Sequence, residues 1–209
     1  MTLWRGTLWR GPSPLALASR SITRRALLEA AGLPVELVDG EVDERAIEAA
    51  APACEAGPDD VARMLARAKA FAGARCVDAD RLVVGADQTL ALAGEVFHKP
   101  KDRASARAQL SRLAGRTHAL HSAVAVVRDA EVVFETVQTA RLTMRALSDT
   151  ALDAYLDAAG PAVLASVGGY QLEGLGVNLF AAIEGDHFTI LGLPLLPLLG
   201  FLRDEGVLL

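Results

Sequence analysis

The strongest constraint on this chain is an apolar strand followed at once by a glycine and a carboxylate. Leu82-Val83-Val84 lead into Gly85, and Asp87 comes two residues later. Ligands of open α/β sheets bind outside the carboxyl ends of the strands, so a strand that ends here places Asp87 where chemistry is usually carried out. Lys99 follows about one hairpin later, and a lysine beside a carboxylate indicates a metal-bound, phosphate-bearing substrate. Acids also end many strands for reasons of turn geometry, so the pair alone decides nothing.

Helical and extended patterns alternate from one end of the chain to the other. Apolar or alternating runs predict strands at 14–18, 35–38, 82–87, 118–127, 132–144 and 177–180. Helical spacing and capping residues predict helices at 22–31, 58–73, 102–114, 148–160 and after Pro194, with a loop at 41–44 and tight turns at 93–94 and 129–130. This alternation predicts an α/β fold with a mixed sheet and flanking helices.

The first residues stand apart from this pattern. Thr-Leu-Trp-Arg-Gly occurs at 2–6 and again at 7–11, and two copies are too few for a solenoid. We therefore predict an N-terminal extension over residues 1–13. No Ser/Gly linker divides the remainder, and 209 residues of which 52% are hydrophobic suffice for one core. Residues 14–209 are expected to form a single domain.

Composition excludes several classes of protein. A net charge of -5 argues against a broad nucleic-acid-binding surface. Cys54 and Cys76 are far apart and form no C-x-x-C pair, which indicates reduced thiols and a cytoplasmic protein. The most apolar run, 190–202, is broken by Pro194 and Pro197 and is shorter than the roughly 20 residues of a membrane helix. We expect binding to neither nucleic acid nor membrane.

Basic and acidic residues at a few places could serve chemistry or only structure. Residues 19–25 join a strand to a helix N-terminus, where backbone N–H groups favour an anion and Arg20 and Arg24 add cationic donors. A capped helix with solvated arginines explains the same residues. Lys69 lies at the edge of an apolar helix face, from which lysines commonly extend to water, and Glu44 could be an ordinary solvated loop acid. His98, His118, His121 and His187 lack zinc-site spacing, and no P-loop or nucleophile elbow is present.

The order of seven short motifs narrows the choice. These are Ala18-Ser19-Arg20-Ser21 with Arg24, Val42-Asp43-Glu44, Ala68-Lys69-Ala70, Gly85-Ala86-Asp87, Lys99-Pro100, Leu113-Ala114-Gly115 and Gly192-Leu193-Pro194. Together they resemble the Maf family of nucleoside triphosphate pyrophosphatases over roughly residues 15–203. The resemblance implies an elongated mixed sheet with two lobes around a central cleft, often dimeric. It also implies hydrolysis of a nucleoside triphosphate to the monophosphate and pyrophosphate with a divalent metal, so the expected partners are the nucleotide and a second copy of the chain.

The resemblance also assigns roles to single residues. Catalysis falls on Asp87, Glu44 and Lys99, and binding of the substrate phosphates on Ser19, Arg24, Lys69 and Lys99. Mg²⁺ or Mn²⁺ takes carboxylate oxygens together with substrate phosphates, which suits Asp87 and Glu44 as the metal ligands. The sequence leaves open which acid is the base. Our hypothesis makes Asp87 the base that accepts a proton from the attacking water, and Glu44 the metal ligand.

Three positions bear on which base is bound: Thr23, Gln88 and Glu173. Gln88 and Glu173 resemble the branch that hydrolyses 7-methyl-GTP, whereas the dTTP/UTP branch has threonine and glutamine there. A carboxylate can accept from guanine N1–H and the exocyclic amine, and a polar mismatch in a closed pocket discriminates strongly. Thr23 departs from the 7-methyl-GTP branch, which typically has tryptophan. Tyr170 or Phe180 would then have to provide the stacking surface for the cationic purine.

Four alternatives remain open at this point. Glu173 could be an ordinary turn acid, and the substrate could be dTTP or UTP. The chain could also act mainly as a nucleotide-binding protein linked to septum formation, although a pure binder would not need both Asp87 and Glu44. Hydrolysis of inosine-type triphosphates on a related fold fits the order of the motifs less well.

Overall fold

The computed structural model describes residues 8–50 and 56–209. Cys54 and the first Thr-Leu-Trp-Arg-Gly copy lie outside these ranges. The strands are β1 (Leu15–Ala18), β2 (Val35–Leu37), β3 (Val83–Leu92), β4 (Glu95–Phe97), β5 (Thr117–Arg128), β6 (Glu131–Met144) and β7 (Phe180–Glu184). The α-helices are α1 (Ile22–Ala30), α2 (Glu44–Ala50), α3 (Pro58–Ala74), α4 (Arg103–Leu113), α5 (Asp149–Ala159), α6 (His187–Ile190) and α7 (Leu195–Asp204). The predicted α/β fold with a mixed sheet and flanking helices is confirmed.

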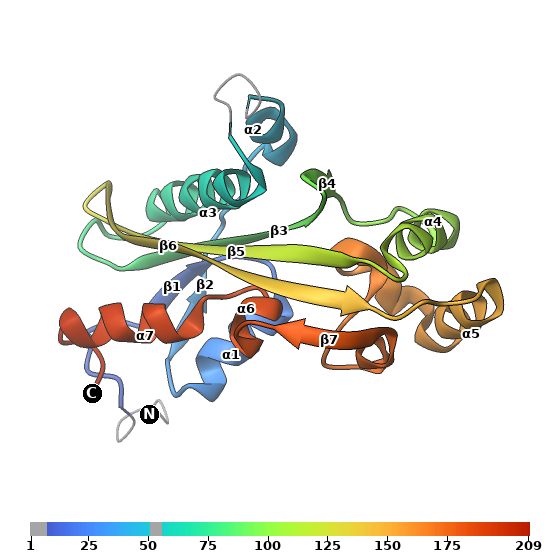
Figure 1. The fold of residues 1–209 in the computed structure, drawn as a ribbon. Helices are drawn as coiled ribbons and strands as arrows, with labels where there is room; N and C mark the ends of the chain where they lie inside the picture. Colours follow the sequence, from blue (N-terminus) through green and yellow to red (C-terminus); the bar gives the residue numbers. More distant parts are fainter. Residues whose placement is uncertain (1–7, 51–55) are drawn as a thin grey trace.

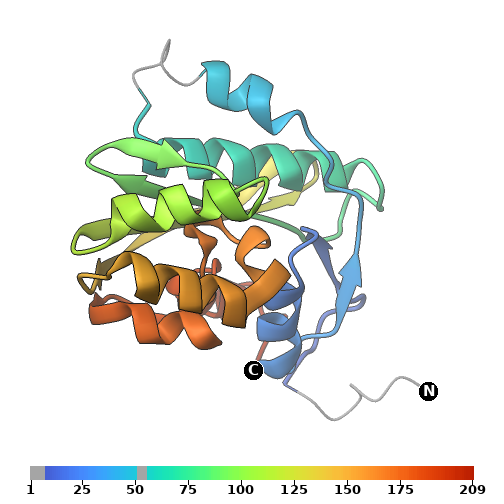
Figure 2. The same ribbon diagram turned by 90° about the vertical axis from the view of Figure 1, so that its right-hand side faces the viewer.

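One seven-stranded sheet in the order β2-β1-β3-β5-β6-β7, with β4 also paired to β3, organises the molecule. β1 runs parallel to β2 and β3, and the other pairs are antiparallel. Helix α3 covers one face of the sheet, while α1, α6 and α7 cover the other (Figure 1). Figure 2 shows α2 beyond α3, on the side away from the sheet.

Capping residues begin and end the helices where the sequence predicts. Asp102 accepts from the Ser105 N–H before α4, and Ser148 accepts from the Ala151 N–H before α5, which satisfies donors at each helix start. After α1, Gly32 adopts φ +81°, the left-handed conformation that closes many helices. Asp129 and Ala130 both have positive φ in the tight turn between β5 and β6.

Two large apolar clusters lie at opposite ends of the long strands, on the face away from α3. One contains Val84 and Ala86 of β3 and packs against α1 and α7. The other contains Leu90 and Leu92 of β3 and packs against α4 and α5. β3 therefore passes from one apolar core to the other, and Gln88 lies at the boundary.

Helix α3 lies unusually close to the sheet because small residues line its contact surface. Ala62, Ala66 and Ala70 pack against Ala123 and Ala125 of β5 in a buried cluster. A glycine is required opposite this helix, because a Cβ at position 85 would lie 2.2 Å from the Ala66 carbonyl oxygen.

The prediction that the third strand ends at Asp87 is wrong. β3 continues to Leu92, and its register with β5 runs without interruption from Val83↔Val127 to Ala91↔Ala119. Gly85 suggested a strand end because glycine is common in turns, but here it permits the close approach of α3. Asp87 therefore lies within a strand.

Two other predicted elements also differ from the structure. Glu44 is the first residue of α2 and does not lie in a loop, since Glu and Ala favour a helix after Asp43, which accepts from the Ala46 N–H. The strand predicted at 177–180 is mostly a 3₁₀ helix, Leu175–Leu179, and β7 begins at Phe180. Within that 3₁₀ helix Gly176 packs closely against the Gln171 backbone, where a Cβ would lie 2.4 Å from the Gln171 carbonyl oxygen.

The described part of the predicted N-terminal extension packs against the C-terminus. Trp9 is 6% exposed, forms a bridge with Leu208, and donates from Nε1 to the Ser13 carbonyl at 3.1 Å. The Arg10 N–H donates to the Val207 carbonyl at 2.8 Å. A domain boundary at residue 13 stays a prediction. Within residues 8–50 and 56–209, each helix is too short or too polar to span a bilayer.

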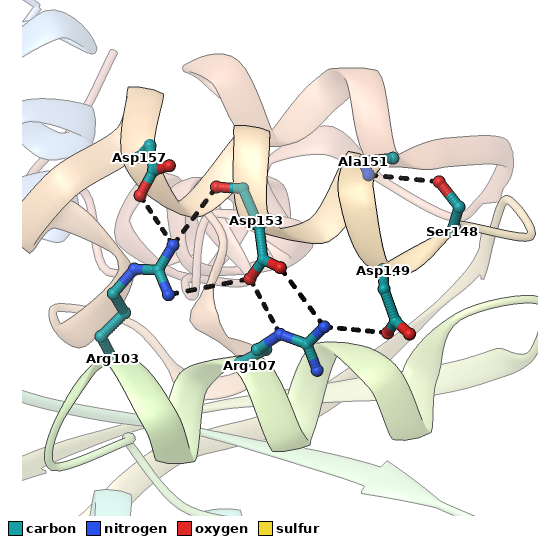
Figure 3. A network of polar contacts seen from close by, with 7 residues as sticks. All are labelled: Arg103, Arg107, Ser148, Asp149, Ala151, Asp153 and Asp157. Atoms are coloured by element: carbon teal, nitrogen blue, oxygen red, sulfur yellow. Dashed lines mark hydrogen bonds and ion pairs between the residues drawn. The ribbon is translucent and has the colours of Figure 1, made fainter.

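Charged residues join α4 to α5 on the surface (Figure 3). Arg107 contacts Asp153 at 2.8 Å and Asp149 at 2.9 Å, and Arg103 contacts Asp157 at 2.7 Å. These side chains are largely exposed, and solvent screening leaves such pairs with little net effect on stability. The apolar cluster beneath them therefore accounts for most of the stability of this end of the molecule.

Replacing Gly85 with alanine tests the close approach of α3. The added Cβ would overlap backbone atoms of Ala66 and Ala70, so we expect Gly85→Ala to lower the free energy of unfolding by about 3 kcal/mol or more. Gly200→Ala is the control, because nothing lies within 4 Å of that position in α7 and alanine favours a helix by about 1 kcal/mol. Urea unfolding of both variants measures the difference. Equal stabilities would contradict the packing described here.

Candidate active site

The candidate site lies where β3 lacks a neighbouring strand along one edge. β1 pairs with β3 only as far as Ala18↔Gly85, and β4 begins to pair at Leu90↔Phe97. Between them, residues 86–89 have no strand partner on this edge among the described residues. The interruption leaves the backbone of this stretch of β3 without a neighbouring strand beside the end of β1 and the start of α1.

Alternate side chains of β3 point to opposite faces here. Asp87 contacts Lys69 of α3, and Thr89 donates to the Pro58 carbonyl at 2.8 Å on the same face. Gln88 points to the other face and contacts α6. The two faces of β3 therefore carry different groups at this point.

Lys69 lies between two carboxylates. Its Nζ contacts Oδ1 of Asp87 and lies 2.7 Å from Oε1 of Glu44. The side chains of Lys69 and Asp87 are each 13% exposed, whereas that of Glu44 is 49% exposed. Residues from α2, α3 and β3 are thus brought together, as their predicted shared role requires.

Glu44 is held in its ionised form. Burial raises the pKa of Glu44, whereas the hydrogen bond and charge of Lys69 and the charges of Lys99 and Arg20 lower it. The lowering effects together are larger, so the pKa lies below the usual value. Lys99 is exposed and forms no ion pair with another described residue, yet its charge acts on Glu44. The positive charges of Lys99 and Arg20 therefore act on Glu44 together with the charge of Lys69.

Arg24 connects three segments of chain beneath the site. Its Nε donates to the Gly192 carbonyl at 2.7 Å, and its Nη1 donates to the Ala86 carbonyl at 3.0 Å and to Ser19 Oγ at 3.2 Å. Burial lowers the pKa of Arg24, and the charges of Asp87 and Glu44 oppose that effect. Arg24 thus fixes the nearly buried Ser19 against the open edge of β3.

A cavity of about 270 Å³ opens beside the loop that joins β1 to the N-terminus of α1. Its lining residues are Ser19, Arg20, Ser21, Ile22, Arg25, Ala26, Glu29 and Leu37. Backbone N–H groups at such a helix start favour anions, and an anion site at residues 19–25 stays a prediction.

Asp87 and Glu44 fit a divalent cation that is shared with a substrate. Among the described residues there is no group of three His, Cys, Asp or Glu side chains that could hold a metal by themselves. Mg²⁺ is commonly held by one or two carboxylates and completed by phosphate oxygens and water. The two acids meet that requirement and present hard oxygen donors close to one another through Lys69.

The three predicted specificity residues come from different segments of the structure. Thr23 is half-buried on α1, Glu173 is exposed, and Gln88 is turned toward α6 with its amide N–H groups engaged. No hydrogen bond among the described residues joins any two of these side chains. Their shared role in specificity stays a prediction.

Tyr170 is buried and is not available to stack on a nucleobase. It is 4% exposed, and its hydroxyl lies 2.7 Å from Nε2 of His118. Its ring packs edge-on against Phe180 with centroids 4.8 Å apart. Of the two residues expected to replace the missing tryptophan, Tyr170 is excluded because its ring is buried, whereas Phe180 is half-buried with its ring against Tyr170 and His118. The pair instead anchors the segment that leads to Glu173.

Sequence reasoning missed the polar residues that support α6. Ser122 and Thr189 are fully buried, and Gln138 accepts from Thr189 Oγ1 at 3.0 Å. The alternating strand positions of Ser122 and Gln138, and the short helix that contains Thr189, did not distinguish these residues from solvent-facing ones. Only the placement of α6 over the sheet reveals their role.

Comparison with known proteins adds a family and relatives. A family model described as Maf-like protein matches residues 14–205. The chain is 56% identical over 204 residues to a protein named nucleoside triphosphate pyrophosphatase from Bradyrhizobium diazoefficiens, covering 96% of this chain and 98% of that protein. It is 52% identical over 194 residues to one named 7-methyl-GTP pyrophosphatase from Rhizobium meliloti, covering 93% and 97%. A solved nucleoside-triphosphatase / dITP/XTP pyrophosphatase from Mycobacterium abscessus is 19% identical with a TM-score of 0.39, covering 92% of this chain and 94% of that one.

The buried His118 makes stability depend on pH. Burial lowers its pKa from 6.5 to about 4, so between these values the unfolded chain binds a proton that the folded chain does not. Stability therefore falls as pH decreases from about 6.5 to about 4, by up to roughly 3 kcal/mol for this one group. Urea unfolding across this range measures it.

His118→Gln serves as the comparison for that pH series. Glutamine keeps a hydrogen-bonding group opposite the Tyr170 hydroxyl but does not titrate. We expect this variant to show a shallower loss of stability between pH 6.5 and 4. Parallel curves for the two proteins would show that His118 is not the group responsible.

Proposed function

The chain belongs to the Maf-like protein family, and on this premise we propose that it hydrolyses 7-methyl-GTP, or another modified purine nucleoside triphosphate, to the monophosphate and pyrophosphate. It is a nucleoside triphosphate pyrophosphatase. The observation that carries the proposal is Lys69 held between Asp87 and Glu44 at the open edge of β3.

The charges around this edge suit a polyphosphate. Lys69 contacts both acids, the charges of Lys99 and Arg20 act on Glu44, and the α1 N-terminus with Ser19 adds N–H and hydroxyl donors. A divalent cation bound by Asp87, Glu44 and the phosphates would offset further negative charge and polarise the α-phosphate. The chain supplies the ligands and the fixed cations for such a substrate.

Asp87 is the base in the mechanism that we propose. A water attacks the α-phosphorus while the bond from that phosphorus to the oxygen bridging it to the β-phosphate breaks. The proton of the water passes to the Asp87 carboxylate, and pyrophosphate leaves. Substrate phosphates compete for Lys69, which frees Asp87 Oδ1 from its ion pair. Glu44, on the more exposed α2, is the metal ligand.

Two observations bear on which nucleobase the substrate carries. Glu173 is exposed and free to accept from a guanine edge, and a relative with 52% identity carries the name 7-methyl-GTP pyrophosphatase. Against these, Thr23 offers no aromatic ring and Tyr170 is buried, which keeps dTTP or UTP as the second candidate. The homodimer implied by the family resemblance stays a prediction.

Asp87→Asn tests the proposed base. Asparagine keeps the shape but accepts no proton at neutral pH, so we expect kcat to fall by roughly 10²- to 10⁴-fold. Pyrophosphate release from 7-methyl-GTP with Mg²⁺ or Mn²⁺ measures it, and Asp80→Asn, which alters an exposed loop acid, is the control. Undiminished turnover would overturn the mechanism. A wild-type protein that binds the nucleotide but does not hydrolyse it would favour the nucleotide-binding alternative.

Glu173→Gln tests which nucleobase the enzyme prefers. If the carboxylate accepts from guanine, its loss should lower the ratio of kcat/KM for 7-methyl-GTP to that for dTTP by about tenfold or more. A panel of 7-methyl-GTP, GTP, ITP, CTP, dTTP and UTP gives the ratio. Glu184→Gln, an exposed acid on β7, provides the matched control. A wild-type preference for dTTP and UTP would contradict the purine proposal while leaving the reaction in place.

A further inference from the structure

A row of polar residues crosses the sheet between the two apolar cores. Gln88 of β3 is in register with Ser122 of β5, which is in register with Gln138 of β6. Two residues before Gln88, Ala86 belongs to one core, and two residues after it, Leu90 belongs to the other. Polar groups in such a position are costly unless each finds a partner.

Helix α6 supplies these partners. Gln88 Nε2 lies 3.1 Å from the Thr189 carbonyl and 3.1 Å from the Ile190 carbonyl, and 2.9 Å from Ser122 Oγ. Ser122 Oγ donates to the Thr189 carbonyl at 2.7 Å. Because carbonyl oxygens can only accept, the amide nitrogen of Gln88 must face α6. Both of its N–H groups are therefore committed to protein acceptors.

The Thr189 carbonyl links this row to the turn that follows α6. It also accepts from the Gly192 N–H at 3.0 Å, while the Gly192 carbonyl accepts from Arg24 Nε at 2.7 Å. Gly192 has φ +94°, and a Cβ there would lie 3.3 Å from the Arg24 guanidinium. Gln88 and Arg24 thus hold the same short turn from opposite sides.

Arg24 carries the connection on to the anion-binding loop. Its Nη1 donates to Ser19 Oγ and to the Ala86 carbonyl. The path from Gln88 therefore passes through the α6 turn and Arg24 to Ser19. Asp87 lies on the other face of β3 and takes no part in it.

We propose that Gln88 is a positioning residue for the phosphate-binding loop and does not contact the nucleobase. This inference rests on the proposed function, because it assigns Ser19 and Arg24 to the substrate phosphates. Gln88 holds residues 189–192 against the sheet, and that turn holds Arg24 and hence Ser19 in place. The side chain acts on all nucleotides alike, because every one of them presents the same triphosphate.

Gln88→Met separates positioning from base recognition. Methionine keeps the length and shape of the side chain but removes both donors, leaving the Ile190 carbonyl without this partner. We expect KM to rise by about tenfold for both 7-methyl-GTP and dTTP, with kcat changed much less, because ground-state binding of the phosphates is what loosens. The ratio of kcat/KM for the two nucleotides should stay within about twofold of the wild-type ratio.

Two variants control for a simple loss of stability. Thr89→Val removes a buried hydrogen bond from the adjacent residue, but on the opposite face of β3 and without a link to Arg24. It should lower the unfolding midpoint with no tenfold rise in KM. Ser122→Ala removes one donor to the Thr189 carbonyl and one acceptor of Gln88 but leaves both contacts of Gln88 with α6, so we expect a smaller rise in KM with the same unchanged ratio.

Hydrogen exchange provides a readout that does not depend on activity. The Gly192 and Leu193 amides should exchange faster in Gln88→Met than in wild type, and remain unchanged in Thr89→Val. A shifted nucleotide ratio would mean that Gln88 contacts the base, and an unchanged KM with unchanged exchange would mean that it does not position the turn; either result overturns the inference. Absence of turnover in the wild-type protein would instead overturn the proposed function, and the exchange measurement would still decide the role of Gln88.

Discussion

The interrupted edge of β3 is the constraint on which the rest of this structure depends. β5 pairs with β3 along its other edge from Val83 to Ala91, so the strand stays extended although β1 stops at Ala18 and the pairing with β4 starts only at Leu90↔Phe97. A continuous sheet thus contains a short stretch open to one side. The Ala86 carbonyl there accepts from Arg24, since no neighbouring strand is present to satisfy it.

Alternation along β3 divides chemistry from support at this opening. Gly85 lets α3 lie against the sheet, and Lys69, adjacent to the closely packed Ala70, can therefore reach Asp87. The next residue, Gln88, faces the other layer and holds α6. A bulkier residue at position 85 would move α3 and its lysine away from the acid. Packing of α3 on one face of the sheet therefore positions Lys69 beside Asp87, and hydrogen bonding to α6 on the other face positions Gln88.

Much of this arrangement could be predicted from the sequence, and the failures have physical causes. Caps such as Asp102 and Ser148 are local, so the helices that they begin were predictable. The proximity of Asp87, Glu44 and Lys69 was predictable only from the order of motifs shared with a family. Gly85 was misinterpreted because glycine serves equally in turns and beneath a close helix, and only tertiary packing distinguishes the two. The direction of Gln88 likewise depends on α6, which lies a hundred residues further along the chain.

The balance of charge at the site explains why cations at its rim matter. Two acidic residues, Asp87 and Glu44, and two cationic residues, Lys69 and Arg24, lie together at the site, and their charges offset one another. Arg24 is committed to carbonyl and hydroxyl acceptors, so its positive charge is fixed within the protein, where it also acts on both acids. In the function that we propose, a polyphosphate finds further compensating charge at Lys99 and Arg20 near Glu44 and in a divalent cation bound by the two acids. A chain with a net charge of -5 can therefore attract a strongly anionic substrate at this one edge.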